Sequence, residues 1–257
     1  EQARVALKAG ANRLYATTDA LAETSWPEDL LAKVTPWLDE VCREIDHSRL
    51  DPYVAAGKPI AVGNISELAL AVERGAIPEV RECIPVHNDY ALQALADMGA
   101  ESVWLNSELT LQEICHMARN ASIPVGYMVS GRIRTMTTEH CILMSTGKCI
   151  HDCDACKLRL EEHTLRGIDN DYMPVRTDRH GRSKIWSPKL FDGVPEMAEM
   201  LSAGVKRFMV DATLLSAEQT REATSRVAAA IAATASGASL PARLKDASVG
   251  HLFSPIG

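Results

Sequence analysis

Apolar and polar positions along the chain repeat one unit. A stretch with apolar residues at three- and four-residue spacing ends in a glycine, and a short apolar run follows it. The glycine is well placed as the left-handed residue that closes a helix before the chain extends. The four copies carry Gly10, Gly75, Gly99 and Gly204. Repeated helix–glycine–strand units predict a parallel sheet covered by helices.

The predicted strands are short and apolar. They cover residues 12–16, 59–64, 80–86, 102–106, 124–130 and 205–211. The predicted helices cover residues 28–45, 66–73, 89–98, 109–119 and 216–233. This pattern predicts an α/β protein, either an incomplete or distorted (β/α) barrel or an open doubly wound sheet. No G-x-G-x-x-G follows a strand, so the barrel-like parallel sheet is favoured.

Residues 131–192 interrupt this repeat. A cysteine-rich stretch lies inside them, and residues 157–165 are predicted to form a short charged helix. Two extended runs, 172–178 and 183–187, flank a turn with a glycine and predict a β-hairpin. The predicted organisation is a barrel-like part in 1–130, a cysteine-rich insertion with a hairpin in 131–192, a returning β/α unit in 193–236 and a C-terminal linker or tail in 237–257.

The composition is that of a globular protein with a large core. The 257 residues are 46% apolar and 24% charged, and the net charge of −7 leaves room only for a local nucleic-acid groove. No run of eighteen apolar residues occurs, so we expect no membrane span. The chain begins Glu1-Gln2-Ala3 without methionine, and its first residues are predicted to be helical. We therefore expect a piece of a longer protein with an additional module.

Four of the seven cysteines fall within sixteen residues. They are Cys141, Cys149, Cys153 and Cys156, spaced C-x7-C-x3-C-x2-C. Four thiolates complete the ligand shell of a zinc ion or of an iron–sulfur cluster, and the spacing alone does not separate the two. The odd cysteine total and the tight grouping fit a reducing cytoplasm better than a pair of disulfides. We therefore predict a cytoplasmic protein in which these thiols bind a metal or a cluster.

Polar residues gather where the predicted strands end, which is where barrel enzymes place their chemistry. The candidate catalytic residues are Asn64, Asn88, Ser107 and Glu108. Asn88 and Ser107 also precede good helix starts, so capping of a helix is the competing interpretation for each. Because several strand ends carry such groups, we expect a shared pocket.

Basic residues concentrate around the cysteines. The candidates for contacts with substrate phosphates are Arg132, Arg176, Arg179 and Arg182. A basic surface on an acidic protein would suit RNA. The competing interpretation is a solvated hairpin whose charges are balanced by neighbouring aspartates and glutamates.

The cysteine motif and the hairpin after it resemble the collagenase-like peptidase family. The resemblance rests on residues 139–156, 172–178, 181–182, 185 and 190, with support from 1–15, 104–109 and 250–253. It implies a barrel-type domain with a cysteine-rich insertion. The spacing between the second and third cysteines is contracted relative to the family, and Trp186-Ser187-Pro188 replaces the family's Asn-Ser.

The resemblance also implies that the four cysteines bind a four-iron four-sulfur cluster. Several members take part in oxygen-independent hydroxylation of tRNA, ribosomal RNA or ubiquinone precursors, and others are described as peptidases of no agreed catalytic type. We therefore expect an iron–sulfur enzyme that modifies RNA or a small aromatic acceptor. The alternatives are a zinc-stapled, non-catalytic binding module of a larger protein, and a peptidase. The sequence has neither H-E-x-x-H nor G-x-S-x-G, which disfavours two common hydrolase mechanisms.

Overall fold

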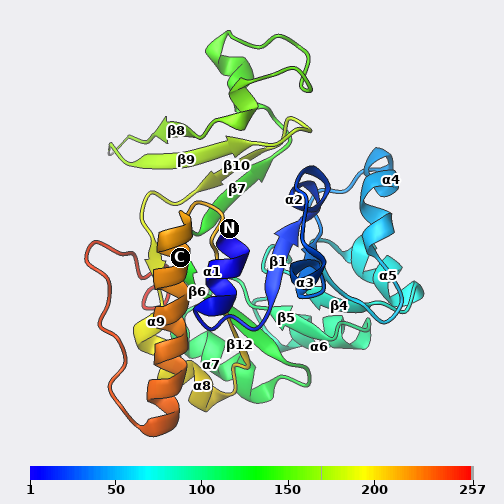
Figure 1. Ribbon diagram of the computed structural model, residues 1–257. Coiled ribbons are helices and arrows are strands. Elements are labelled where there is room, and N and C mark those ends of the chain that lie inside the picture. The colour runs from blue at the N-terminus through cyan, green and yellow to red at the C-terminus, as the bar shows by residue number, and fades with distance from the viewer. Residues whose placement is uncertain (169, 256–257) are drawn as a thin grey trace.

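The computed structural model of the chain describes residues 1–168 and 170–255. A curled parallel sheet forms a half-barrel at its centre (Figure 1). Seven parallel strands follow one another in the order β1-β2-β3-β4-β5-β6-β12 and turn through 232°. These strands are β1 (Leu14–Thr17), β2 (Val34–Trp37), β3 (Pro59–Val62), β4 (Ile77–Val80), β5 (Ser102–Trp104), β6 (Val125–Gly131) and β12 (Arg207–Val210). The predicted barrel-like α/β fold is confirmed.

Helices cover the outer face of the half-barrel (Figure 1). They are α1 (Gln2–Lys8), α2 (Thr18–Glu23), α3 (Glu28–Leu31), α4 (His47–Leu50), α5 (Ile65–Glu73), α6 (Asp89–Asp97), α7 (Leu111–Asn120), α8 (Met197–Ala203) and α9 (Ala217–Ser236). The core lies between strands and helices, where Ile60, Leu68 and Ile114 are fully buried. None of the helices formed by the described residues combines the length and the apolar character needed to cross a bilayer.

The predicted helix–glycine–strand units are confirmed. All four of their glycines have positive φ, with Gly204 at +110° ending α8 before the chain enters β12. The starts of two helices are also determined by residues close in sequence. Thr110 and Ser216 cap α7 and α9, each accepting a hydrogen bond from the backbone N–H three residues on.

The prediction of one long helix over residues 28–45 was wrong. The chain instead forms the short α3, then β2, then a 3-10 turn at Glu44–Asp46. The apolar spacing around Trp37 suits a helix, but parallel pairing with β1 and β3 holds this segment as a strand, in which Thr35 is buried and Trp37 is partly exposed. The strand predicted at 80–86 also lies earlier, at β4.

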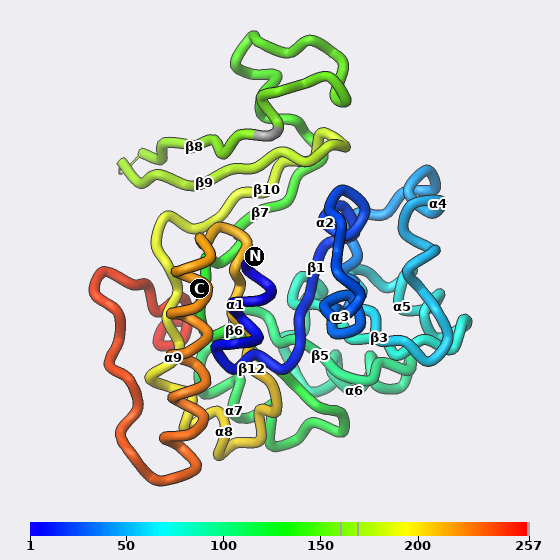
Figure 2. The backbone as a smooth tube through the Cα atoms, viewed as in Figure 1, coloured from blue at the N-terminus to red at the C-terminus, as the bar shows by residue number. Residues whose placement is uncertain are grey.

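The insertion forms a second sheet that continues from the end of β6. Its antiparallel order is β7-β10-β9-β8. The strands are β7 (Arg134–Thr138), β8 (His163–Arg166), β9 (Tyr172–Thr177) and β10 (Ser183–Trp186). The β9–β10 hairpin was predicted correctly, whereas the helix predicted over 157–165 is a 3-10 turn at Leu158–Leu160 followed by β8. The cysteine-bearing segment extends beyond this sheet, at the top of Figure 2.

One side of the half-barrel is open. In the described part of the chain β1 pairs only with β2, and β12 pairs only with β6. Helices α1 and α9 lie together over the gap, where the side-chain amide of Gln2 donates to the carbonyl oxygen of Ala212 (Figure 1). The packing is close, since a Cβ on Gly10 would lie 3.0 Å from Ala228 Cβ. The sheet is thus unpaired between β1 and β12, and residues of α1 and α9 line its interior there.

A buried carboxyl group lies where β2 and β3 come closest. A Cβ on Gly63 would lie 2.7 Å from the Asp39 carbonyl oxygen, so only glycine fits there. The Gly63 N–H donates to Glu67 Oε2 at 2.9 Å, and Glu67 is 3% exposed. Burial raises the pKa of Glu67 to about 7, although the Gly63 N–H and the charge of Arg81 act in the opposite direction.

We expect Glu67→Gln to stabilise the protein at pH 8 and to change its stability little at pH 5. The native carboxyl is neutral at pH 5, and its folded pKa lies above the ordinary value of 4.5. Ionisation therefore destabilises the native state by up to about 3 kcal/mol as pH rises through this window. Urea unfolding at both pH values measures the effect, with exposed Glu73→Gln as the control. Equal pH dependence in wild type and Glu67→Gln would contradict it.

Candidate functional site

The four predicted ligand cysteines lie on one loop above the β9–β10 hairpin. The hairpin turn touches this loop, because a Cβ on Gly181 would lie 3.8 Å from Cys141 Cβ and 3.9 Å from Cys153 Sγ. Burial raises the pKa of Cys153, and the other three thiols raise it further through their charges. Among the described residues, no three Cys, His, Asp or Glu side chains lie close enough together to hold one metal ion.

Short-range hydrogen bonds shape the cysteine loop. The His151 N–H points at Cys149 Sγ, 3.4 Å away, and His151 has a positive φ of 55°. Asp152 Oδ1 accepts from the N–H groups of Asp154 and Ala155, both at 3.1 Å. An N–H aimed at sulfur stabilises a thiolate and tunes a bound centre. These local hydrogen bonds hold the backbone between the second and fourth cysteines in one conformation.

The loop is anchored where it leaves β7. The Ile142 N–H donates to Ser183 Oγ at 3.1 Å, and Ser183 Oγ is 2.9 Å from Thr177 Oγ1 in a buried pair. Leu143 is 3% exposed. Because Ser183 and Thr177 belong to β10 and β9, the hairpin holds the first cysteine end of the loop in place.

A groove of about 1380 Å³ occupies the interior of the half-barrel and reaches the ends of its strands. Three aromatic side chains line it. The ring of Tyr15 lies 5.2 Å from that of Trp37 and 5.8 Å from that of Trp104, both edge to face. The Arg81 guanidinium lies 4.5 Å from the centre of the Trp37 ring. These three rings, here called the aromatic box, pack against one another and give the groove an apolar wall.

Charged groups with spare hydrogen-bonding capacity lie beside the aromatic box. Arg134 Nη2 binds Glu40 Oε2 at 3.0 Å and Glu82 Oε1 at 3.1 Å. Burial, the largest influence, raises the pKa of Glu40, but Arg134 and Arg81 outweigh it and lower that pKa overall. Arg81 is 1% exposed and donates through Nη1 to the Leu38 carbonyl oxygen.

Several buried polar atoms of this cluster have no hydrogen-bond partner among the described residues. They are Glu40 Oε1, Glu82 Oε2, Arg81 Nε and Arg81 Nη2. Native proteins rarely leave such atoms unsatisfied unless water or a ligand meets them. These unpartnered atoms lie buried behind the wall of the groove.

Comparison with protein-family models matched Peptidase family U32 over residues 81–249. The chain belongs to this family. The match begins after β4 and takes in the cysteine loop, the hairpin and α9, so the predicted collagenase-like peptidase family is confirmed. Searches of curated proteins and of solved structures gave no match.

The U32 chain does not bring the four predicted catalytic residues into one pocket. Asn64 and Asn88 cap α5 and α6, each accepting from a backbone N–H at 2.9 Å, so the capping interpretation of Asn88 is confirmed. Ser107 lines the groove and caps no helix, since Thr110 caps α7. Glu108 is half exposed and lies 3.5 Å from His87 Nε2.

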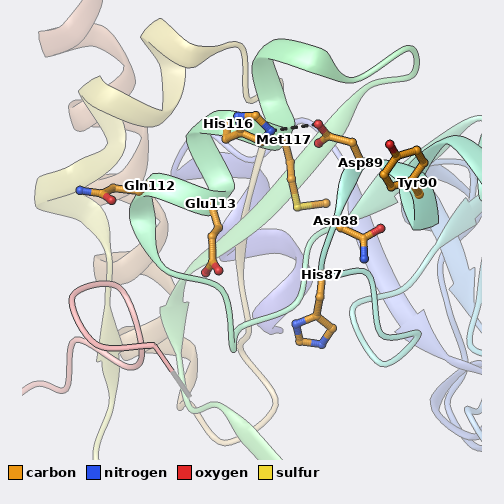
Figure 3. A pocket seen from close by; sticks show the side chains of 8 residues that line it. All are labelled: His87, Asn88, Asp89, Tyr90, Gln112, Glu113, His116 and Met117. Carbon is orange, nitrogen blue, oxygen red and sulfur yellow. Dashed lines mark hydrogen bonds and ion pairs between the residues drawn. The ribbon is translucent and has the colours of Figure 1, made fainter. Parts of the chain in front are cut away.

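A second, smaller pocket of about 440 Å³ lies between the starts of α6 and α7 (Figure 3). His116 Nε2 binds Asp89 Oδ2 there at 2.9 Å. Among the described residues that line it, none is a serine, threonine or cysteine. The histidine–carboxylate pair there has no aliphatic hydroxyl or thiol among the described lining residues to serve as the nucleophile of a serine- or cysteine-type hydrolase.

The four predicted phosphate-binding arginines have protein partners. Arg132 donates to the carbonyl oxygen of Ser187 at 2.8 Å, and Arg176 pairs with Glu162 at 3.1 Å. Arg179 lies 3.4 Å from Glu23 at the surface. Arg182 is 5% exposed and binds Asp46 at 2.6 Å. Arg182 thus faces inward, while Arg176 and Arg179 remain at the surface with acidic neighbours.

Sequence reasoning missed the aromatic box and its charged neighbours. Trp37 and Trp104 are the last residues of β2 and β5. An aromatic residue at the end of a short strand was the available signal, and the helix predicted over 28–45 concealed it for Trp37.

Beneath the box, Glu79 joins strands that do not pair with each other. It is 1% exposed and accepts from Tyr15 Oη at 2.6 Å and from Arg207 Nη1 at 2.9 Å, with Arg13 as a third partner. Burial and then the Glu79 charge raise the pKa of Tyr15 to about 12. Glu79 lies in β4, Arg13 precedes β1 and Arg207 begins β12, so this contact spans the open side.

We expect Glu79→Gln to lower the free energy of unfolding by about 2 kcal/mol, because two arginines lose their shared buried carboxylate while both keep some contact with water. Urea unfolding measures the loss, and hydrogen exchange should show it first in β1. Glu101→Gln, at an exposed position before β5, is the matched control. A Glu79→Gln protein as stable as this control would show that the contact is dispensable.

Proposed function

We propose that this member of Peptidase family U32 is an iron–sulfur enzyme whose four loop cysteines bind a four-iron four-sulfur cluster. The observation that carries the proposal is the position of Cys141 and Cys153 against the Gly181 turn, with Cys149 and Cys156 on the same loop. A reducing, cytoplasmic location is part of the proposal, because the thiols must stay free.

The resemblance of the cysteine motif to the U32 family favours a cluster over one zinc ion. Four thiolates complete the ligand shell of either group, so the spacing of the cysteines does not separate the two. Several members of the family carry a four-iron four-sulfur cluster on such cysteines, and we propose the same role for Cys141, Cys149, Cys153 and Cys156.

The bound cluster would supply one-electron chemistry. The chain contributes the four thiolates, the N–H of His151 that stabilises the Cys149 sulfur, and the turn that supports the loop. The proposed reaction is an oxygen-independent hydroxylation of RNA or of a small aromatic acceptor, for which water would supply the oxygen atom and an external electron acceptor would take the two electrons released.

The groove supports a flat, uncharged ring as the acceptor. Tyr15, Trp37 and Trp104 form its apolar walls. The charges of Arg81 and Arg134 are balanced by those of Glu40 and Glu82, so a ligand that brings its own charge would upset the balance. A ring that carries a hydroxyl or an amide on its edge can pack against these aromatic walls and both donate and accept hydrogen bonds. Both a phenol and an unstacked nucleobase carry such an edge.

We expect protein prepared without oxygen to contain about four irons and four sulfides per chain and to absorb light at about 400 nm. Cys153→Ser should lose this absorbance because it removes one of the four thiolates. Cys42→Ser, a change outside the loop, should keep it. Iron and sulfide analysis beside the spectrum gives the measurement.

Other outcomes would replace the proposal. One zinc per chain and no iron would favour a zinc-stapled binding module. Gelatin cleavage that survives Cys153→Ser but is lost in Glu108→Gln would favour a peptidase.

A further inference from the structure

The turn between β9 and β10, residues 178–182, joins the cysteine loop to the end of the half-barrel. Hydrogen bonds within the turn hold its backbone in one conformation. The Asp178 N–H donates to the Arg182 carbonyl oxygen at 2.8 Å, and Asp178 Oδ1 accepts from the N–H groups of His180 and Arg182 at 2.9 and 3.0 Å. Gly181 has φ of +77°, which glycine adopts without strain. The turn is therefore a rigid piece rather than a loose connection.

Two consecutive residues of this turn face in different directions. Gly181 faces the cysteines. A Cβ atom on Gly181 would lie 3.8 Å from Cys141 Cβ and 3.9 Å from Cys153 Sγ. Arg182 enters the protein, where its side chain is 6% exposed. A movement of Arg182 would therefore shift the surface that supports the cysteine loop.

Arg182 forms ion pairs with acidic groups near the strand ends of the half-barrel. Its Nη2 lies 2.6 Å from Asp46 Oδ2, its Nη1 lies 3.5 Å from Asp39 Oδ2, and its Nε lies 3.7 Å from Glu139 Oε1. Asp39 lies just beyond β2, and Glu139 lies two residues before Cys141. Arg182 thus holds the half-barrel and the start of the cysteine loop together.

A second arginine shares the same acids. Arg49 Nη2 lies 2.8 Å from Asp39 and 3.1 Å from Asp46. Asp39 and Asp46 are 8% and 4% exposed. Two buried carboxylates shared by two arginines keep their charges balanced, and Arg49 retains both acids when Arg182 is replaced. The acidic pocket can therefore persist without Arg182, so loss of Arg182 should act on the loop.

We propose that Arg182 is a positioning residue: its anchor in the Asp39–Asp46 pocket fixes the 178–182 turn, and with it the cysteine loop, over the end of the groove. This inference rests on the proposed function, since the purpose of the anchor is to keep the cluster and the acceptor groove in one geometry. It concerns the chain's own residues and is testable without the cluster.

The first test is hydrogen exchange of the metal-free protein. In Arg182→Met the amides of residues 139–156 should exchange about tenfold faster, while β3 to β6 keep wild-type rates. Arg179→Met is the matched control, because Arg179 belongs to the same turn but pairs with Glu23 at the surface. Arg182→Lys should recover part of the protection, since it restores the charge without the planar fork. Wild-type exchange of 139–156 in Arg182→Met would overturn the inference.

A double variant separates positioning from general stability. Asp46→Asn in the Arg182→Met background removes a carboxylate that has lost one partner, so it should recover part of any lost stability. The cysteine loop should nevertheless exchange as fast as in Arg182→Met alone. Restored loop protection in the double variant would overturn the inference.

The second test uses the iron-loaded protein. Arg182→Met should keep about four irons per chain but broaden the electron paramagnetic resonance signal of the reduced cluster and shift its reduction potential, because the loop no longer has one geometry. An unchanged signal and potential would overturn the inference, while a wild-type protein that binds no iron would count against the proposed function instead.

Discussion

A parallel sheet that does not close must hold its two end strands by something other than main-chain hydrogen bonds. Here the Glu79 carboxylate does so, because its partners Arg13, Tyr15 and Arg207 come from both sides of the opening. Burying a carboxylate is costly unless several donors meet it, and three side chains do. The open barrel thus depends on one buried carboxylate whose hydrogen-bond partners are all in place. The positions of the groups above Glu79 depend on this contact.

The aromatic box is the first such feature. Tyr15 donates its hydroxyl to Glu79 and presents its ring to Trp37 and Trp104. Its pKa is raised, so the hydroxyl stays protonated and keeps donating through the physiological range. Because one residue serves both the ion contact and the box, the walls of the groove cannot move independently of the strands. A rigid wall of this kind favours a ligand recognised by its flat shape.

The parts of the fold that could be predicted are those written in short stretches of sequence. A glycine closing a helix acts on its own neighbours, so units such as the one ending at Gly204 were recognised, and cysteines close in sequence were grouped correctly on one loop. Strand β2 was missed because four residues around Trp37 satisfy a helical spacing as well as a strand, and only the neighbouring strands decide between them. The Glu79 contact spans residues 13 to 207, which no local pattern can reveal.

The arginines around the cysteine loop also show what the sequence could not predict, and here the difference affects the proposed function. Arg179 and Arg182 are three residues apart in one turn, yet one lies at the surface and the other is buried against Asp46. The reversal of the chain at Gly181 separates them, and a count of charges gives both the same weight. The surface arginines that remain have acidic partners, as Arg176 has Glu162, on a chain of net charge −7. Phosphate contacts would have to displace those partners, whereas three aromatic rings already line the groove. Of the two acceptor classes, the small aromatic ring therefore matches the charge distribution better than RNA.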